Sequence, residues 1–129
     1  MIVVEETGEI RGKPVLSVRL LNDVTVTPEM EAEIRANWKQ LYVNYKSFYF
    51  LVDITNLTMM DAFTLVPKVA SLLHTTREQS REQVISTGLV MSPLAQPLFA
   101  AVTALYPPER PVLIGATREE VWQKLVEDV

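Results

Sequence analysis

The 129-residue chain contains no cysteine and only one histidine, His74, and these shortages exclude several kinds of chemistry. Without cysteine there is no disulfide, no thiolate nucleophile and no thiolate metal ligand. A single histidine cannot build a three-histidine or histidine–cysteine metal site. We therefore expect no metal and no cofactor, and the lack of cysteine fits a reducing compartment, with the cytoplasm as the default.

Glycine, basic charge and long apolar runs are also scarce. The glycines lie far apart, at Gly8, Gly12, Gly88 and Gly115, so the sequence has neither a phosphate-cradling loop nor a dinucleotide fingerprint. The net charge of -4, with both signs scattered along the chain, gives no basic stripe for a nucleic-acid backbone. No apolar run reaches the length of a signal peptide or a membrane span. These patterns predict that the chain does not bind nucleic acid and does not span a membrane.

The chain does have the composition of one globular domain. Hydrophobic residues make up 48% and charged residues 22%, which is close to the usual balance. A chain of this length holds one core more readily than two. We expect a single domain over residues 1–129.

The first half of the chain predicts a hairpin, a helix and a buried strand. The β-rich runs 2–7 and 15–21 are so close in sequence that they can pair only antiparallel. Thr27-Pro28-Glu29 is a helix start, and apolar residues then recur every three or four positions up to Tyr45. The continuous apolar run 48–52 is typical of a central strand buried on both faces, and it ends at Asp53.

The second half alternates helices and strands. The pattern predicts a helix from about 64 to 76, a polar link over 77–83, a strand over 84–91, a helix up to 106, a strand over 111–115 and a last helix after a capping box at 117–120. The order β-β-α-β-α-β-α-β-α predicts an α/β fold. We expect a mixed sheet of about five strands, with an antiparallel edge hairpin and four helices.

The residues around Asp53 carry a resemblance to a known family. The strand end 51–55, the segment 57–61 and the helix start near Thr64 together resemble the STAS domain, the module shared by sulfate transporters and anti-sigma-factor antagonists (SpoIIAA-like). In that family a hydrophobic pair precedes Asp-Ser-Ser-Gly at the helix start. This sequence reads Met59-Met60-Asp61-Ala62-Phe63-Thr64. The resemblance follows the element order over nearly the whole chain, and it implies a regulatory module that binds a protein and is not an enzyme.

The sequence departs from the family at two positions. The family's serine after the aspartate is phosphorylated by a partner kinase, which switches binding off, but Ala62 has no hydroxyl. The resemblance therefore implies a domain that is not switched at this position, with Thr64 or Thr58 as possible displaced acceptors. If Asp61 capped the helix, Pro67 would lie inside it at a cost of about 3 kcal/mol. With Thr64 as the cap, the loop is expected to be longer than in the family.

The expected binding surface is this loop and the first turns of the helix after it. Loops at the carboxyl ends of strands are where open α/β sheets bind, and methionine and phenylalanine are enriched at interfaces. We expect Phe63 to be the apolar anchor, with Asp61 and Thr64 fixing orientation by hydrogen bonds. Ala62 and Met59 complete the predicted surface, although Met59, like Met60, has the alternative of packing beneath the helix.

Other interpretations of the polar residues are weaker. Asp53 with Glu5 and Glu6 could mimic the magnesium site of a receiver domain, but a receiver needs a helix where this chain has only a short hairpin link. We expect Asp53 to accept backbone hydrogen bonds from the next loop instead. His74 falls in the last turn of a predicted helix, where an imidazole is favourable against the dipole without any catalytic role.

Two further functions stay open. The chain could carry a small apolar ligand in a pocket between sheet and helices. It could also assemble with itself as a homodimer, with the first strand pairing as an exposed edge. Trp38 and Trp122 lie on the apolar stripes of their helices and are expected to be core residues.

Overall fold

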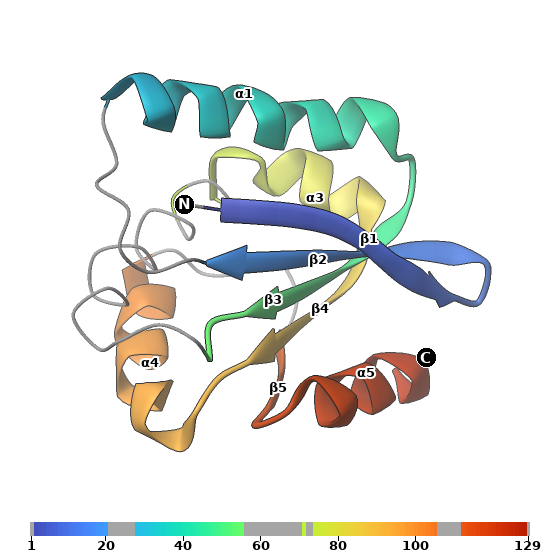
Figure 1. Ribbon diagram of the computed structural model, residues 1–129, viewed down its shortest axis with the longest axis vertical. Helices are drawn as coiled ribbons and strands as arrows, with labels where there is room; N and C mark the ends of the chain where they lie inside the picture. Colours follow the sequence, from blue (N-terminus) through green and yellow to red (C-terminus); the bar gives the residue numbers. More distant parts are fainter. Residues whose placement is uncertain (1, 21–27, 56–70, 72–73, 106–111, 129) are drawn as a thin grey trace.

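The computed structural model describes residues 2–20, 28–55, 71, 74–105 and 112–128. The elements in these residues are β1 (Ile2–Ile10), β2 (Lys13–Leu20), α1 (Pro28–Asn44), β3 (Phe48–Asp53), α3 (Arg77–Gln83), β4 (Val84–Val90), the 3-10 helix η1 (Pro93–Ala95), α4 (Gln96–Leu105), β5 (Val112–Gly115) and α5 (Arg118–Glu127). Figure 1 uses the same labels.

The strands form one five-stranded sheet in the order β1-β2-β3-β4-β5. The β1–β2 pair is antiparallel and the other neighbouring pairs are parallel, as the sequence predicts. Arg11 and Gly12 close the hairpin with φ values of 52° and 77°, and this pair of positive angles matches the twist of the strands that it joins. The predicted α/β fold with an antiparallel edge hairpin is therefore confirmed.

The predicted polar link at 77–83 is wrong, because these residues form the helix α3. The sequence of α3 is polar throughout and lacks the apolar stripe that marks a helix, and none of its residues is buried. Glu78 in its first turn and Arg81 in its last turn complement the helix dipole. The predicted helix over 64–76 lies mostly outside the described residues, although Ser71, His74 and Thr75 are helical.

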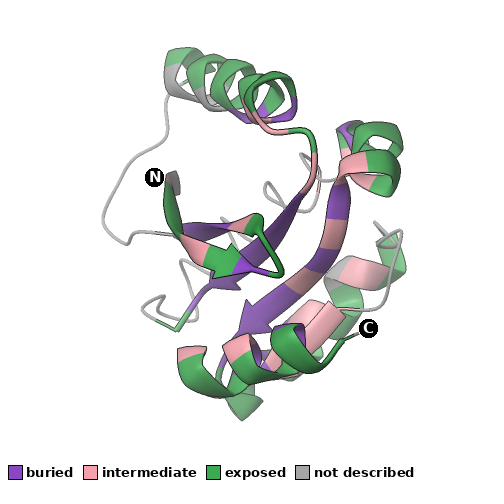
Figure 2. Cartoon of the chain, turned by 90° about the vertical axis from the view of Figure 1, so that its right-hand side faces the viewer, coloured by how far each residue is buried: buried purple, intermediate pink, exposed green. Residues whose placement is uncertain are grey.

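The helices cover the sheet on both faces (Figures 1 and 2), with α1 and α3 on one side and α5 on the other. Side chains alternate along β3, so Phe48 and Phe50 join the core beneath α1, while Tyr49 and Leu51 join the core beneath α5. All residues of β3 are buried, which confirms the prediction of a central strand covered on both faces. Across the described residues, no helix has the length and hydropathy needed to cross a membrane.

Polar side chains join α1 to α3. The indole Nε1 of Trp38 donates to Thr76 Oγ1 at 3.2 Å, and the hydroxyls of Tyr42 and Ser80 share a hydrogen bond of 2.7 Å. Gln83 Nε2 donates to the backbone oxygens of Tyr42 and Tyr45 at 2.8 and 2.9 Å. These carbonyls lie at the carboxyl end of α1, where the helix offers no further backbone N–H to pair with them. The bonds fix a short polar helix that has little apolar surface of its own.

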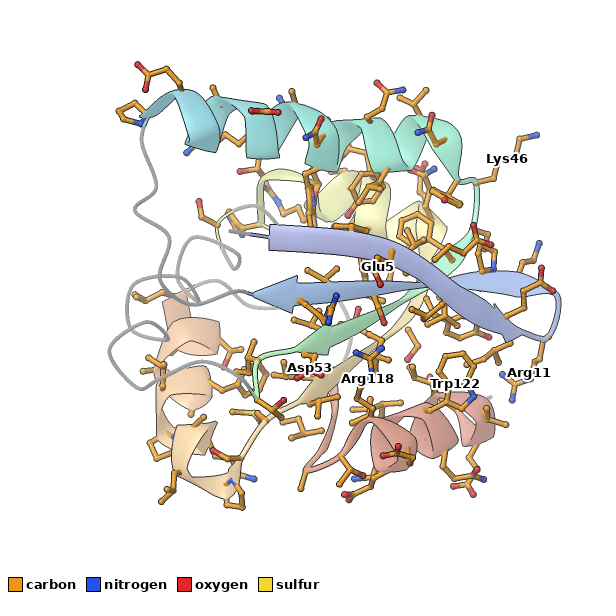
Figure 3. All side chains as sticks on the ribbon, viewed as in Figure 1. Glu5, Arg11, Lys46, Asp53, Arg118 and Trp122 are labelled. Atoms are coloured by element: carbon orange, nitrogen blue, oxygen red, sulfur yellow. The ribbon has the colours of Figure 1, made fainter. Side chains whose placement is uncertain are left out.

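The hairpin turn holds the carboxyl end of α5. Arg11 Nη1 donates to the backbone oxygen of Asp128 at 3.0 Å and to Tyr49 Oη at 3.3 Å, and its Nη2 donates to the backbone oxygen of Val126. A guanidinium at this place also opposes the negative end of the helix dipole. Figure 3 shows Arg11 and Trp122 at this end of the sheet. The half-buried Trp122 packs against the core beneath α5, as expected of a core residue.

Candidate functional site

Asp53 closes the carboxyl end of β3 and directs the chain into the next segment. Its carboxylate is buried, and Oδ1 accepts hydrogen bonds from the backbone N of Thr55 at 2.9 Å and from Thr55 Oγ1 at 2.6 Å. An aspartate that bonds its own backbone two residues on forms a turn without a partner from elsewhere in the chain. The prediction that Asp53 accepts a backbone hydrogen bond from the following loop is confirmed.

The second carboxylate oxygen connects Asp53 to α5. Arg118 Nη1 lies 3.5 Å from Asp53 Oδ2, and Arg118 Nη2 donates to Ser17 Oγ at 2.8 Å. The hydroxyls of Ser17 and Thr7 share a hydrogen bond of 3.2 Å. We call Thr7, Ser17, Asp53, Thr55 and Arg118 the polar brace, because they link β1, β2, β3 and α5 in one hydrogen-bonded chain. Figure 3 shows its ion pair on the α5 side of the sheet.

Strand register and a helix cap assemble the polar brace. Ser17 pairs with Leu51 across the parallel β2 and β3 strands, so Ser17 and Asp53 emerge on the same face. Thr117 caps α5 by accepting the backbone N–H of Glu120 at 3.1 Å, which sets Arg118 at the first helical position. The predicted capping box is modified, because the Glu120 carboxylate accepts from the backbone N of Ala116 at 3.1 Å rather than from that of Thr117.

Removing Arg118 is expected to destabilise the domain through Asp53. In Arg118→Met, the buried Asp53 Oδ2 loses its cation, and Ser17 loses a hydrogen-bond donor. The Arg118 side chain is 38% exposed, so solvent screening limits the loss to about 1–2 kcal/mol of unfolding free energy. Urea denaturation at neutral pH measures this change. The control Arg35→Met, on the exposed side of α1, should change stability by less than about 0.5 kcal/mol; equal losses in both variants would contradict the role of the brace.

The other carboxylates considered for a metal site are engaged elsewhere. Glu5 Oε1 lies 3.4 Å from Arg19 Nη2, and Glu6 Oε2 accepts from Tyr45 Oη at 3.3 Å. Burial, and then the charge and hydrogen bond of Glu6, raise the pKa of Tyr45 above its usual value. Within the described residues, no three metal-binding side chains gather, so Glu5, Glu6 and Asp53 do not form the magnesium site of a receiver domain.

The predicted binding surface lies outside the described residues. This holds for its members Met59, Asp61, Ala62, Phe63 and Thr64, for the possible acceptor Thr58, and for Met60 and Pro67. Thr55, at the end of the polar brace, is the last described residue before this segment. Of the other residues singled out, Trp38 is buried as predicted, and the half-buried His74 accepts at its backbone oxygen from Arg77 Nη1 at 3.0 Å.

Sequence reasoning missed Ser17 and Arg118 as partners of Asp53. Ser17 interrupts an apolar run, Val15-Leu16-Ser17-Val18, in a strand whose neighbours are buried on both faces. A buried hydroxyl needs a hydrogen-bond partner, so a serine within this apolar run indicates a polar contact on one face of the strand. The identity of that partner depends on the position of α5.

No family model matches the sequence, and neither a curated protein nor a solved structure matches it.

Proposed function

We propose that this domain is a non-enzymatic, cytoplasmic protein-interaction module of the anti-sigma-factor-antagonist type, which binds its partner through the segment after β3. The polar brace is the observation that supports this proposal. Both oxygens of Asp53 are engaged, one by Thr55 and the other by Arg118, so the most buried carboxylate of the described residues orients the chain as it leaves the sheet. A fixed exit from a rigid sheet suits a binding loop.

The order of the described strands offers no switch point for a small ligand. Doubly wound sheets bind small molecules in the crevice where the strand order reverses. Among the described strands the order runs from β1 to β5 without reversal. The helices α1, between β2 and β3, and α3, between β3 and β4, lie on the same face of the sheet. This is the arrangement expected when both connections between parallel strands have the same handedness. A ligand carrier would need an apolar pocket between the sheet and the helices instead.

In this proposal the partner contacts the loop at Met59 and 61–64. Phe63 supplies the apolar anchor, and Asp61 and Thr64 orient the partner through hydrogen bonds. Ala62 leaves the position of the family's phosphorylated serine without a hydroxyl, so binding is not switched there. Regulation at Thr58 or Thr64 stays a separate proposal, which intact-protein mass spectrometry of the native chain tests directly.

Phe63→Asp is expected to weaken partner binding by roughly thirtyfold or more, because a charge replaces the apolar side chain that the proposed partner contacts. The matched control is Val43→Asp, which makes the same kind of change at a side chain that is 74% exposed on α1. Wild-type protein and both variants serve as baits in native lysate. The expected result is a protein captured by wild type and Val43→Asp and lost with Phe63→Asp, and calorimetry with that purified protein gives the affinities.

All baits must first have the same circular dichroism spectrum, so that lost capture reports on the surface and not on unfolding. Equal capture by wild type and Phe63→Asp would show that the loop is not the binding surface. Empty lanes from three folded baits would count against a protein-binding module. Native mass spectrometry of the same preparation would then test the ligand carrier by a mass shift.

A further inference from the structure

The two outer strands of the sheet, β1 and β5, differ in how they are protected. An outer strand has backbone N–H and C=O groups that no neighbouring strand uses, and these groups invite pairing with another chain. The strand β1 exposes Glu5, Glu6 and Glu9 and has a register shift between Glu6 and Gly8. Charged side chains and bulges both oppose the pairing of edges. The sequence of β1 therefore protects its own edge.

The strand β5 has neither of these features. Residues 111–117 contain no charged side chain, and β5 consists of three half-buried apolar residues followed by Gly115. Its register with β4 runs without a shift. Among the described strands, none pairs with β5 on the side away from β4. A regular, uncharged, apolar edge is the kind of edge to which another chain adds a strand.

The backbone of Ile114 faces away from β4. The backbone oxygen of Gly115 accepts from the backbone N of Met91 at 3.0 Å, so Gly115 directs its carbonyl towards the β4 side. Because successive residues of a strand direct their backbone polar groups to opposite sides, those of Ile114 and Val112 point outward. The oxygen of Ile114 is therefore an acceptor that an added strand would use.

Lys124 occupies this acceptor. Its Nζ donates a hydrogen bond to the backbone oxygen of Ile114. Lys124 lies in the last turn of α5, the helix that follows β5 and runs back along the sheet (Figure 1). A hydrogen bond from an ammonium group is stronger than one from a neutral amide. Lysine at a sheet edge is also a common means of preventing edge pairing.

Glu120 holds the ammonium group of Lys124 in place. Glu120 Oε1 lies 3.7 Å from Lys124 Nζ, and Glu120 Oε2 accepts from the backbone N of Ala116 at 3.1 Å. Gly115 permits this approach, because a Cβ atom there would lie 3.1 Å from Glu120 Cγ. The ion pair is exposed, so it orients Lys124 more than it stabilises the fold. We call Glu120, Lys124 and the backbone oxygen of Ile114 the β5 edge cap.

We propose that the β5 edge cap is an autoinhibitory contact that prevents a strand of a second chain from adding to β5. An added strand would have to displace Lys124 from the Ile114 oxygen and remove its charge from water. Of the two sheet edges in the described residues, Lys124 caps the one without charges of its own. This inference is independent of the proposed function, because it requires no partner at residues 59 and 61–64.

Lys124→Met is expected to form β-sheet assemblies at least about fivefold faster than wild type, because the Ile114 oxygen loses its charged donor. The control Lys39→Met makes the same substitution at an exposed position on α1 and should assemble at the wild-type rate. Each substitution changes the net charge from -4 to -5, so charge repulsion would slow both variants. Light scattering and the infrared band of intermolecular β-sheet measure the rates. Equal rates for the two variants would overturn the proposal.

Two further variants separate the edge cap from the stability of α5. Lys124→Arg keeps a cationic donor and should restore the wild-type rate. Val121→Ala removes buried contacts of the same helix without changing the edge, so it should assemble more slowly than Lys124→Met. If Val121→Ala assembled as fast, unfolding of α5 would be the cause, and the proposal would be wrong.

Quenched hydrogen exchange locates the contact in assemblies of Lys124→Met. The amide N–H groups of Val112 and Ile114 point outward, so they should exchange more slowly in the assemblies than in the monomer. Unchanged exchange at both amides would show that the chains meet at another surface, and the β5 edge cap would then not be the contact that prevents assembly.

Discussion

Replacing Trp38 with alanine is expected to lower the free energy of unfolding by about 3–5 kcal/mol, which is a large part of the stability of a small domain. Trp38 is 2% exposed and stacks on Phe50 with ring centroids 5.2 Å apart and planes 14° from parallel. The variant loses this apolar contact and leaves a cavity between α1 and the sheet. Urea denaturation followed by far-UV circular dichroism measures the loss without relying on tryptophan fluorescence.

Trp38→Phe separates packing from hydrogen bonding. It keeps a ring near Phe50 but removes the Nε1 donor to Thr76, so we expect a smaller loss of roughly 1–2 kcal/mol. Thr76 is not left without a bond, because its hydroxyl also lies 3.2 Å from the Tyr42 hydroxyl. If phenylalanine and alanine were equally destabilising, the hydrogen bond would dominate, and the packing explanation would be wrong.

The strands of this fold follow from local sequence because each has a distinctive pattern. The continuous apolar run at 48–52 predicts a strand buried on both faces, and β3 is buried along its whole length. The close spacing of the first two β-rich runs admits only a hairpin, and the Arg11-Gly12 turn supplies the required positive φ angles. In both cases the determining interactions are close in sequence.

The helix α3 is not predictable in the same way. Its sequence is polar throughout, so hydrophobic periodicity gives no signal, and its composition resembles a linker. Its position depends on hydrogen bonds from Ser80 and Gln83 to Tyr42, about forty residues earlier in the chain. Such tertiary contacts override local propensity.

The candidate site shows the same division between local and distant contacts. The turn from Asp53 to Thr55 spans two residues, and the sequence predicts its essential feature, a backbone hydrogen bond from the next loop to Asp53. The contact between Arg118 and Ser17 spans 101 residues. It requires both the β2–β3 register and the position of α5 against the sheet. The predicted binding residues 59 and 61–64 lie outside the described residues, so their role stays a prediction.

Gly88→Ala is expected to lower the free energy of unfolding by about 1–3 kcal/mol or more through overpacking beneath α5. A Cβ atom at Gly88 would overlap Val121 Cγ1 and would lie 3.3 Å from Leu125 Cδ1. Val121 and Leu125 are fully buried, so neither side chain can move aside without displacing the helix. Displacement of α5 would also draw Arg118 away from Asp53, because Arg118 begins the same helix. Thermal and urea denaturation measure the loss.

The double variant Gly88→Ala/Val121→Ala tests whether this single contact is responsible. Val121→Ala alone should cost about 1.5–3 kcal/mol through lost burial and a cavity. In the double variant, the new methyl group at position 88 occupies the space that the valine methyl groups leave. The combined loss should therefore be smaller than the sum of the single losses by at least about 0.5 kcal/mol. Additive losses would mean that Gly88 matters for backbone conformation rather than for the close approach of α5. Other contacts would then determine the position of α5 against the sheet, and with it the position of Arg118 in the polar brace.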